Sequence, residues 1–219
     1  MSSVLVVIPT YNESESIKSL LTRLDASRKV ISNSFVIDIL LVDDSSPDKT
    51  AQIASAMNLS NFSVLNRSQK SGLGPAYLAG FKEGLMGDYQ YFVEMDADLS
   101  HQPEQLVDLL KAASANSLVI GTRWMPDGSV VNWPKKRRWI SKIGTGYASF
   151  ALKLPYKDLT SGYRVLPRQL LEKIDFTAIE TRGYGFQIEM ALKENLVNAS
   201  ENTLNRQFSV RKLPQSRPT

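Results

Sequence analysis

The chain has 219 residues, of which 42% are hydrophobic and 22% are charged, as in ordinary globular proteins. This length suits one α/β domain with a sizeable core. Cysteine is absent and His101 is the single histidine, which excludes disulfides, thiolate metal sites and multi-histidine metal sites. A chain without cysteine is compatible with a reducing cytoplasm.

The formal net charge of +4 is modest and unevenly distributed along the chain. Basic residues gather in 135–142 and again in 206–217, and such clusters bind nucleic acid, phosphorylated ligands or anionic lipid surfaces. The N-terminus lacks a basic leader followed by a long apolar region, so we expect no signal peptide. No stretch approaches the roughly 20 apolar residues of a membrane span, so none is predicted.

Up to residue 121, apolar runs alternate with segments of helical periodicity. Strands are predicted at 4–8, 35–42, 62–65, 91–95 and 117–121, of which the first, second and fourth are expected to be buried and the third is shorter. Helices are predicted at 13–24, 48–57, 75–85 and 103–113. Strands that alternate with helices of about ten residues indicate an α/β fold with a mostly parallel sheet covered on both faces.

The pattern changes after Arg123. The later segments are a loop at 125–134, an amphipathic helix at 136–154, a short strand at 158–165, helices at 167–174 and 185–196, and a polar tail from Asn198. We interpret residues 1–219 as a single domain in two halves. Residues 1–121 form the nucleotide-binding half, and residues 122–219 form a half that faces the acceptor.

Two aspartates, Asp96 and Asp98, directly follow the apolar stretch 91–95, with only Ala97 between them. In an extended chain, residues i and i+2 project to the same face, so both carboxylates can reach one cation. Mg²⁺ and Mn²⁺ are commonly held by one or two carboxylates plus substrate phosphates. The pair suggests a metal that carries a diphosphate. The alternative is ordinary turn chemistry, because aspartate is common where strands end.

Polar residues also follow the first two predicted strands, and ligands of open α/β sheets bind at that edge. Tyr11 can stack on a base, and Glu13 and Asp44 can accept hydrogen bonds from a base or ribose. Both segments are alternatively helix starts, with N-caps near Asn12 and at 46–48.

Other phosphate sites are weakly supported. Gly72-Leu73-Gly74 is either a phosphate contact or a flexible entry to the next helix. The motifs G-x-G-x-x-G after the first strand and G-x-x-x-x-G-K-[ST] are both absent, which disfavours dinucleotide and P-loop sites. His101 is expected to be a surface or helix-start residue.

The motifs together resemble, in order and spacing, the GT-A-type inverting glycosyltransferases. They are P-T-Y-N-E at 9–13, V-D-D-S-S-P-D at 42–48, K-S-G-L-G at 70–74 and M-D-A-D-L-S-H at 95–101. Later segments narrow the resemblance to the polyprenol-phosphate (dolichol-phosphate) mannose synthase family: G-T-R-W at 121–124, N-W-P-K-K-R-R-W-I-S at 132–141, D-L-T-S-G-Y-R at 158–164 and G-Y-G-F-Q-I-E-M at 183–190. This resemblance implies a GT-A (Rossmann-like) sheet and metal-dependent, inverting transfer of mannose from GDP-mannose to a polyprenyl phosphate.

The resemblance also assigns expected roles to individual residues. Asp96 and Asp98 are expected to hold Mg²⁺ or Mn²⁺. The expected catalytic residues are Asp98, Arg123, Arg137 and Ser141, the last three at positions that meet donor or acceptor phosphates. The expected nucleotide-sugar contacts are Pro9, Tyr11, Glu13, Val42, Asp44, Lys70, Asp96, Ala97, Asp98, Arg123, Arg211 and Arg217.

The chain departs from the family pattern near its C-terminus. Relatives carry R-x-x-G-x-S-K as a basic clamp on the phosphates, and here residues 211–217 read R-K-L-P-Q-S-R. Pro214 replaces the glycine and removes both flexibility and an N–H, and Arg217 replaces the lysine. Ser100 stands where some members carry a glutamine metal ligand. In this register Arg211 and Arg217 occupy the two basic positions of the clamp.

A lipid acceptor implies a peripheral protein at the cytoplasmic face of a membrane, with room for a membrane-anchoring subunit. The segment 133–142 interleaves basic and aromatic residues and suits an anionic interface, with a solvated basic helix face as the alternative. Nucleic acid is the least expected partner, because the basic clusters flank a carboxylate-rich cleft. Two other functions stay open: a UDP-sugar-dependent glucosyl or aminosugar transferase acting on the same lipid, and a catalytically silent nucleotide-sugar or lipid-phosphate binding protein.

Overall fold

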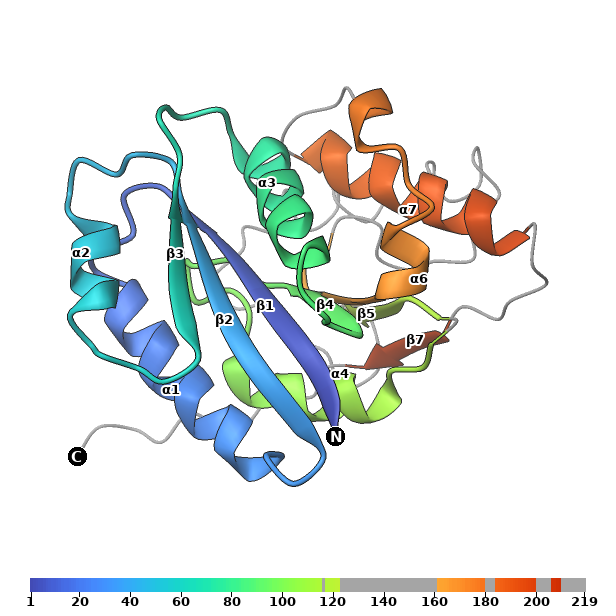
Figure 1. Cartoon of the computed structure of the whole chain (residues 1–219), viewed down its shortest axis with the longest axis horizontal. Coiled ribbons are helices and arrows are strands. Elements are labelled where there is room, and N and C mark those ends of the chain that lie inside the picture. The colour runs from blue at the N-terminus through green and yellow to red at the C-terminus, as the bar shows by residue number, and fades with distance from the viewer. Residues whose placement is uncertain (116, 123–160, 180–183, 200–205, 210–219) are drawn as a thin grey trace, which may run out of the picture.

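A computed structural model describes residues 1–115, 117–122, 161–179, 184–199 and 206–209. Within this part of the chain, a seven-stranded sheet has the order β3-β2-β1-β4-β6-β5-β7 (Figure 1). The strands are β1 Ser2–Thr10, β2 Phe35–Asp43, β3 Phe62–Asn66, β4 Tyr91–Glu94, β5 Val119–Thr122, β6 Arg164–Pro167 and β7 Arg206–Ser209. The helices are α1 Ile17–Val30, α2 Thr50–Ser55, α3 Leu73–Leu85, α4 Leu106–Ala112, α6 Arg168–Leu171 and α7 Tyr184–Ala199, with short 3₁₀ turns η1 Pro103–Gln105 and η2 Phe176–Ala178.

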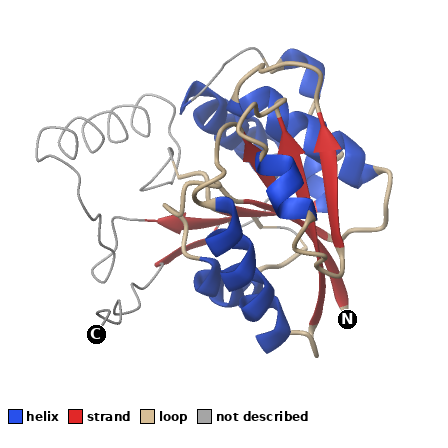
Figure 2. Ribbon diagram, turned by 90° about the vertical axis from the view of Figure 1, so that its left-hand side faces the viewer, coloured by secondary structure: helices blue, strands red, loops and turns tan. Residues whose placement is uncertain are grey.

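The sheet is buried on both faces, which explains why its central strands are continuously apolar. In β1, Val4, Val6 and Ile8 point into a core shared with α1, α2 and α4. Leu5 and Val7 point the other way, into a core shared with α3, α6 and α7. Figure 2 shows the helices lying on both sides of the sheet. The predicted α/β fold with a mostly parallel, doubly covered sheet is confirmed.

Helix α3 lies unusually close to the sheet because Gly80 has no side chain. A Cβ atom at Gly80 would overlap Cγ1 of Val7 and would lie 3.1 Å from Cγ2 of Val42. Real side chains could not be accommodated there without movement of two core residues. The close approach places the N-terminal turns of α3 beside the ends of β1 and β4, where polar residues gather.

The C-terminal half differs in detail from the predicted elements. The strand predicted at 158–165 is found at Arg164–Pro167, and it pairs antiparallel with both β4 and β5. The segment predicted to be a polar tail contributes β7, which pairs parallel with β5. The predicted loop at 125–134 and helix at 136–154 lie outside the described residues. Among the helices that are described, none has both the length and the apolar character required to cross a bilayer.

Candidate active site

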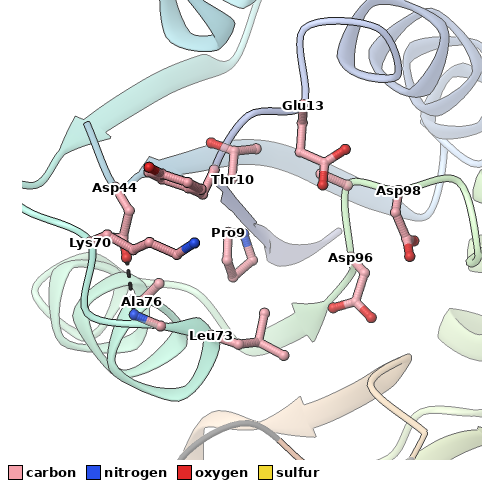
Figure 3. Close-up of a pocket in the computed structure, with 12 residues that line it drawn as sticks. Pro9, Thr10, Glu13, Asp44, Lys70, Leu73, Ala76, Asp96 and Asp98 are labelled. Atoms are coloured by element: carbon pink, nitrogen blue, oxygen red, sulfur yellow. Dashed lines mark hydrogen bonds between the residues drawn. The ribbon is translucent and has the colours of Figure 1, made fainter. Parts of the chain in front are cut away.

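A cavity of about 370 Å³ opens at the carboxyl ends of β1, β2 and β4. Its lining residues are Pro9, Thr10, Tyr11, Glu13, Asp44, Lys70, Gly72, Leu73, Ala76, Asp96, Ala97 and Asp98. Figure 3 shows Asp44 and Lys70 on one side of the cavity and Asp96 and Asp98 on the other, with Pro9 between them. This is the edge of an open α/β sheet at which ligands bind.

The segment V-D-D-S-S-P-D holds together the loops that follow β1 and β2. Thr10 Oγ1 donates to Asp43 Oδ1 at 2.9 Å. Asp48 accepts from the backbone N–H groups of Ser14 at 2.9 Å and Thr50 at 3.1 Å. Hydrogen bonds from Ser14 and Thr50, opposed by partial desolvation, lower the pKa of Asp48. Asp43 and Asp48 are therefore structural, and Asp44 is the carboxylate of this segment that lines the cavity.

Asp44 secures the loop that carries Lys70. Its Oδ1 accepts from Arg67 Nη1 at 2.8 Å, and its Oδ2 accepts from the backbone N–H groups of Ser71 at 2.9 Å and Gly72 at 3.3 Å. A carboxylate offers about four acceptor positions, so one remains for a ligand. The loop places the Lys70 ammonium 3.7 Å from the centre of the Tyr11 ring. Lys70 thus shares with Asp44 the side of the cavity at which a base was expected.

The two aspartates of the D-x-D segment have different surroundings. Asp98 is exposed, and its Oδ1 accepts from the backbone N–H of Ser100 at 2.9 Å. Leu99 adopts a left-handed conformation with φ of 61°, a strained geometry that often accompanies functional loops. Asp96 Oδ1 accepts from the hydroxyl of Tyr77 at 2.9 Å. Burial, together with the negative charges of Asp96 and Glu94, raises the pKa of Tyr77 well above its ordinary value, so the hydroxyl stays a donor.

A buried ion pair lies directly beneath the D-x-D segment. Glu94 and Arg164 are both fully buried, with Arg164 Nε 4.0 Å from Glu94 Oε2. Arg164 also donates to the backbone carbonyls of Ser161 and Gln187, each at 2.9 Å. Burial raises the pKa of Glu94 to about 7, although the charge of Arg164 opposes the shift. Through these contacts Arg164 joins β4, β6 and α7 at the base of the site.

The charges of the cavity suit a divalent cation bound with a phosphorylated ligand. Its lining contains the carboxylates of Glu13, Asp44, Asp96 and Asp98 against the ammonium of Lys70, so an anionic diphosphate needs additional positive charge to enter. No group of three or more metal-binding side chains occurs in the described residues. Two carboxylates completed by ligand phosphates nevertheless match the way in which proteins hold Mg²⁺ or Mn²⁺. When bound, such an ion would act as a Lewis acid on the phosphate oxygens.

Most predicted site residues that the structure describes lie together at this cavity. Pro9, Tyr11, Glu13, Asp44, Lys70, Asp96, Ala97 and Asp98 all line it. Val42 is fully buried in the sheet and does not line the cavity, so its part in nucleoside binding stays a prediction. Arg123, Arg137, Ser141, Arg211 and Arg217 lie outside the described residues.

Sequence reasoning missed two side chains behind Asp96. Tyr77 shares a face of α3 with Phe81, a spacing that predicts core packing and carries no sign of a carboxylate partner. His101 is not a free surface residue, because its Nδ1 accepts from the backbone N–H of Asp96 at 3.0 Å. Its place directly after the D-x-D segment was the one available signal.

The fold and site define a GT-A-type glycosyltransferase. Residues 5–175 match the family model described as Glycosyl transferase family 2, and the chain belongs to this family.

Two curated relatives and one solved structure illustrate the similarity. The chain is 48% identical over 192 residues to the undecaprenyl-phosphate mannosyltransferase of Micrococcus luteus, covering 87% of this chain and 76% of the relative. It is 42% identical over 214 residues to the polyprenol monophosphomannose synthase of Mycolicibacterium smegmatis, covering 96% and 75%. The fold is similar to that of glucosyl-3-phosphoglycerate synthase from Mycobacterium tuberculosis in complex with Mn²⁺, UDP and phosphoglyceric acid. The TM-score is 0.66, the identity is 19%, and the match covers 99% of this chain and 72% of that one.

Proposed function

We propose that the protein transfers a mannosyl group, with inversion, from GDP-mannose to a polyprenyl phosphate, with Mg²⁺ or Mn²⁺ held by Asp96 and Asp98. The observation that carries the proposal is the convergence of carboxylates from the ends of β1, β2 and β4 on one cavity. The relatives named as mannosyl transferases of undecaprenyl phosphate and polyprenol supply the substrate class.

The two sides of the cavity suggest how a nucleotide sugar would lie. Asp44 retains an acceptor position for a base or ribose N–H or O–H, and Tyr11 and Lys70 flank it. The diphosphate would extend past Pro9 toward Asp96 and Asp98. In this orientation the sugar would face the half of the chain beyond residue 121. In this proposal Arg123, Arg137 and Ser141 meet the donor and acceptor phosphates, and Arg211 and Arg217 close over the donor.

The reaction requires no strong general base. The second pKa of a phosphate monoester is about 6, so the polyprenyl phosphate is already an anion near neutral pH. Its oxygen forms a bond to the anomeric carbon as the bond to the nucleoside diphosphate breaks on the opposite face. The protein must then offset repulsion between two phosphates and the charge of the leaving group, which is the task of forked arginine donors and the cation.

A polyprenyl phosphate acceptor implies that the reaction takes place at a membrane surface. The basic and aromatic segment 133–142 would lie at the anionic cytoplasmic face, with Arg137 turned toward the acceptor phosphate. A membrane-anchoring subunit is compatible with this placement. In this proposal residues 1–121 form the nucleotide-binding half, and residues 122–219 form the half that faces the acceptor.

The donor and the activity are tested together by offering radiolabelled nucleotide sugars with a short-chain polyprenyl phosphate. GDP-mannose should give labelled lipid, and GDP should raise the melting temperature more than UDP at equal concentration, because a ligand stabilises the state that it binds. Transfer from a UDP-sugar with no shift by GDP would favour the UDP-dependent alternative. Binding of GDP-mannose without any turnover would favour the silent binding protein.

The metal is tested by removing it. Exhaustive chelation should reduce transfer to background, and Mg²⁺ or Mn²⁺ should restore it, with no advantage for Zn²⁺ because the proposed ligands are all oxygen atoms. The chelator pre-saturated with Mg²⁺ serves as the control for effects unrelated to the metal. Full transfer in the chelated sample would contradict the proposed cation.

A further inference from the structure

The carboxylate of Asp96 is held from behind by a tyrosine that does not itself line the cavity. Tyr77 is fully buried on α3, and its hydroxyl donates to Asp96 Oδ1 at 2.9 Å. The tight packing of Gly80 against Val7 fixes the distance of α3 from the sheet. The position of the Tyr77 hydroxyl is therefore set by the core of the protein and not by a mobile loop.

His101 holds the backbone of Asp96 and lies against its other carboxylate oxygen. Its Nδ1 accepts from the backbone N–H of Asp96 at 3.0 Å, and its Nε2 lies 3.7 Å from Asp96 Oδ2, beyond hydrogen-bond distance. The ring stacks on Tyr163 with centroids 4.9 Å apart. Gly162 lies beside the same two side chains, because a Cβ built there would be in ordinary contact with Asp96 Oδ2 and His101 Cε1, each at 3.4 Å.

Within the described part of the chain, Asp98 has no comparable support. It is exposed, and its side chain accepts from the N–H of Ser100 in its own turn. The side chain of Asp96 is 29% exposed, so it still presents lone pairs to the cavity. The Asp96 side chain is thus fixed by protein contacts before a cation binds. The described residues do not hold the Asp98 side chain in this way, so it can adjust its position to the cation.

We propose that Tyr77 and His101 are positioning residues that fix the Asp96 carboxylate for the divalent cation, an inference that rests on the proposed function. A carboxylate oxygen has two lone pairs, so a bond from Tyr77 leaves Oδ1 able to bind a cation as well. Metal-binding carboxylates are commonly oriented by hydrogen bonds from residues behind them, and loss of such a partner costs about 10-fold to 100-fold in metal affinity or activity. Fixing the ligand beforehand also removes the entropy that its ordering would cost on binding.

The test measures Mn²⁺ binding directly, without turnover. Mn²⁺ is titrated into the full-length protein with saturating GDP, and free Mn²⁺ is followed by electron paramagnetic resonance. Tyr77→Phe removes one hydroxyl and should raise the Mn²⁺ dissociation constant about tenfold or more. GDP affinity in metal-free buffer should stay unchanged, because the buried Tyr77 does not line the cavity.

A matched control is available in Tyr89→Phe. The Tyr89 hydroxyl donates to the carboxylate of Asp38 at 2.6 Å, away from the cavity, so this variant also loses a tyrosine–aspartate hydrogen bond. It should bind Mn²⁺ as the parent protein does. A second pair tests the histidine: His101→Leu should weaken Mn²⁺ binding, and His101→Gln, whose side-chain carbonyl oxygen can accept from the Asp96 N–H as Nδ1 does, should recover part of the loss.

The outcomes separate this inference from the proposed function. Asp96→Asn is measured in parallel and should weaken Mn²⁺ binding severely. If Asp96→Asn does so while Tyr77→Phe matches Tyr89→Phe, positioning by Tyr77 is refuted and the metal site stands. If Asp96→Asn and Asp98→Asn both bind Mn²⁺ normally, the metal site of the proposed function is refuted, and the positioning role with it.

Discussion

Replacing Asp98 by alanine should reduce mannosyl transfer by at least about a hundredfold, the scale on which removal of a group that stabilises transition-state charge acts. The carboxylate is exposed at the rim of the cavity and is proposed to bind the cation on the donor diphosphate. Its loss leaves Asp96 as the single proposed carboxylate ligand, so a cation that still binds is no longer fixed against the leaving diphosphate. Turnover is measured with a short-chain polyprenyl phosphate at saturating Mn²⁺, so that a weakened metal affinity alone cannot explain the loss.

Folding should survive this change better than the equivalent change at Asp96. Asp98 accepts one recorded hydrogen bond, from Ser100 in its own turn. Asp96 accepts from the buried hydroxyl of Tyr77, and a buried donor left without a partner costs about 1–3 kcal/mol. Asp96→Asn keeps an acceptor for Tyr77 and is the better test of chemistry at that position. It should lose transfer as Asp98→Ala does while retaining a melting temperature close to that of the parent.

The exposed Asp108 on α4 provides the matched control. Asp108→Ala removes the same group from the surface and should leave both turnover and the melting temperature unchanged. Near-normal transfer by Asp98→Ala and Asp96→Asn, alongside Asp108→Ala, would mean that neither carboxylate carries the reaction.

The elements of residues 1–122 could be predicted closely because their signals are local. The apolar runs that become β1, β2 and β4 are largely buried on both faces, so their burial does not depend on which strand lies beside them, whereas the edge strand β3 is only partly buried. Carboxyl ends of parallel strands meet at one edge, and this rule alone brings Asp44 and Asp96 to the same cavity. Only the boundaries differed: α1 begins at Ile17 and not at 13, because Glu13 and Ser14 are engaged by Thr50 and Asp48.

The remaining features depend on contacts between distant parts of the chain. The sequence of residues 164–167 does not indicate that β6 runs antiparallel between β4 and β5. The direction of β6 is set by its backbone pairing with these two strands, which are distant in the sequence. The short β7 joins the sheet through backbone hydrogen bonds, which a polar sequence can make as well as an apolar one. The helical spacing of Tyr77 predicts a core residue. Its contact with Asp96 depends on how α3 packs on the sheet, which the helical spacing does not indicate. Val42 was assigned to the nucleoside by resemblance, whereas the buried strand predicted at 35–42 already indicated a core position for its side chain, which the structure shows.

Arg164→Met should destabilise the protein by about 3–5 kcal/mol, because removing one member of a buried ion pair leaves an uncompensated charge. Arg164 and Glu94 are both fully buried, and Arg164 also donates to the carbonyls of Ser161 and Gln187. The variant would leave these two carbonyls and the Glu94 carboxylate without the guanidinium. Urea unfolding of the purified protein at pH 8 measures the loss as a lower midpoint. In the parent protein this pH lies above the Glu94 pKa of about 7, so the ion pair is formed there, and the variant must either bury the charge of Glu94 or protonate it against a pKa raised further by the loss of Arg164.

Glu94→Gln should cost much less than Arg164→Met, since burial already disfavours the ionised carboxylate and Arg164 retains its carbonyl partners. The double variant should be more stable than the sum of the two single changes predicts, because the charge stranded by Arg164→Met is then absent. The pair Arg23–Glu104 is the control: its side chains are 32% and 34% exposed, and Arg23→Met should cost no more than about 1 kcal/mol. Equal midpoints for Arg164→Met and Arg23→Met would show that the buried pair does not hold β4, β6 and α7 together. The base of the D-x-D segment would then owe its position to the apolar core alone.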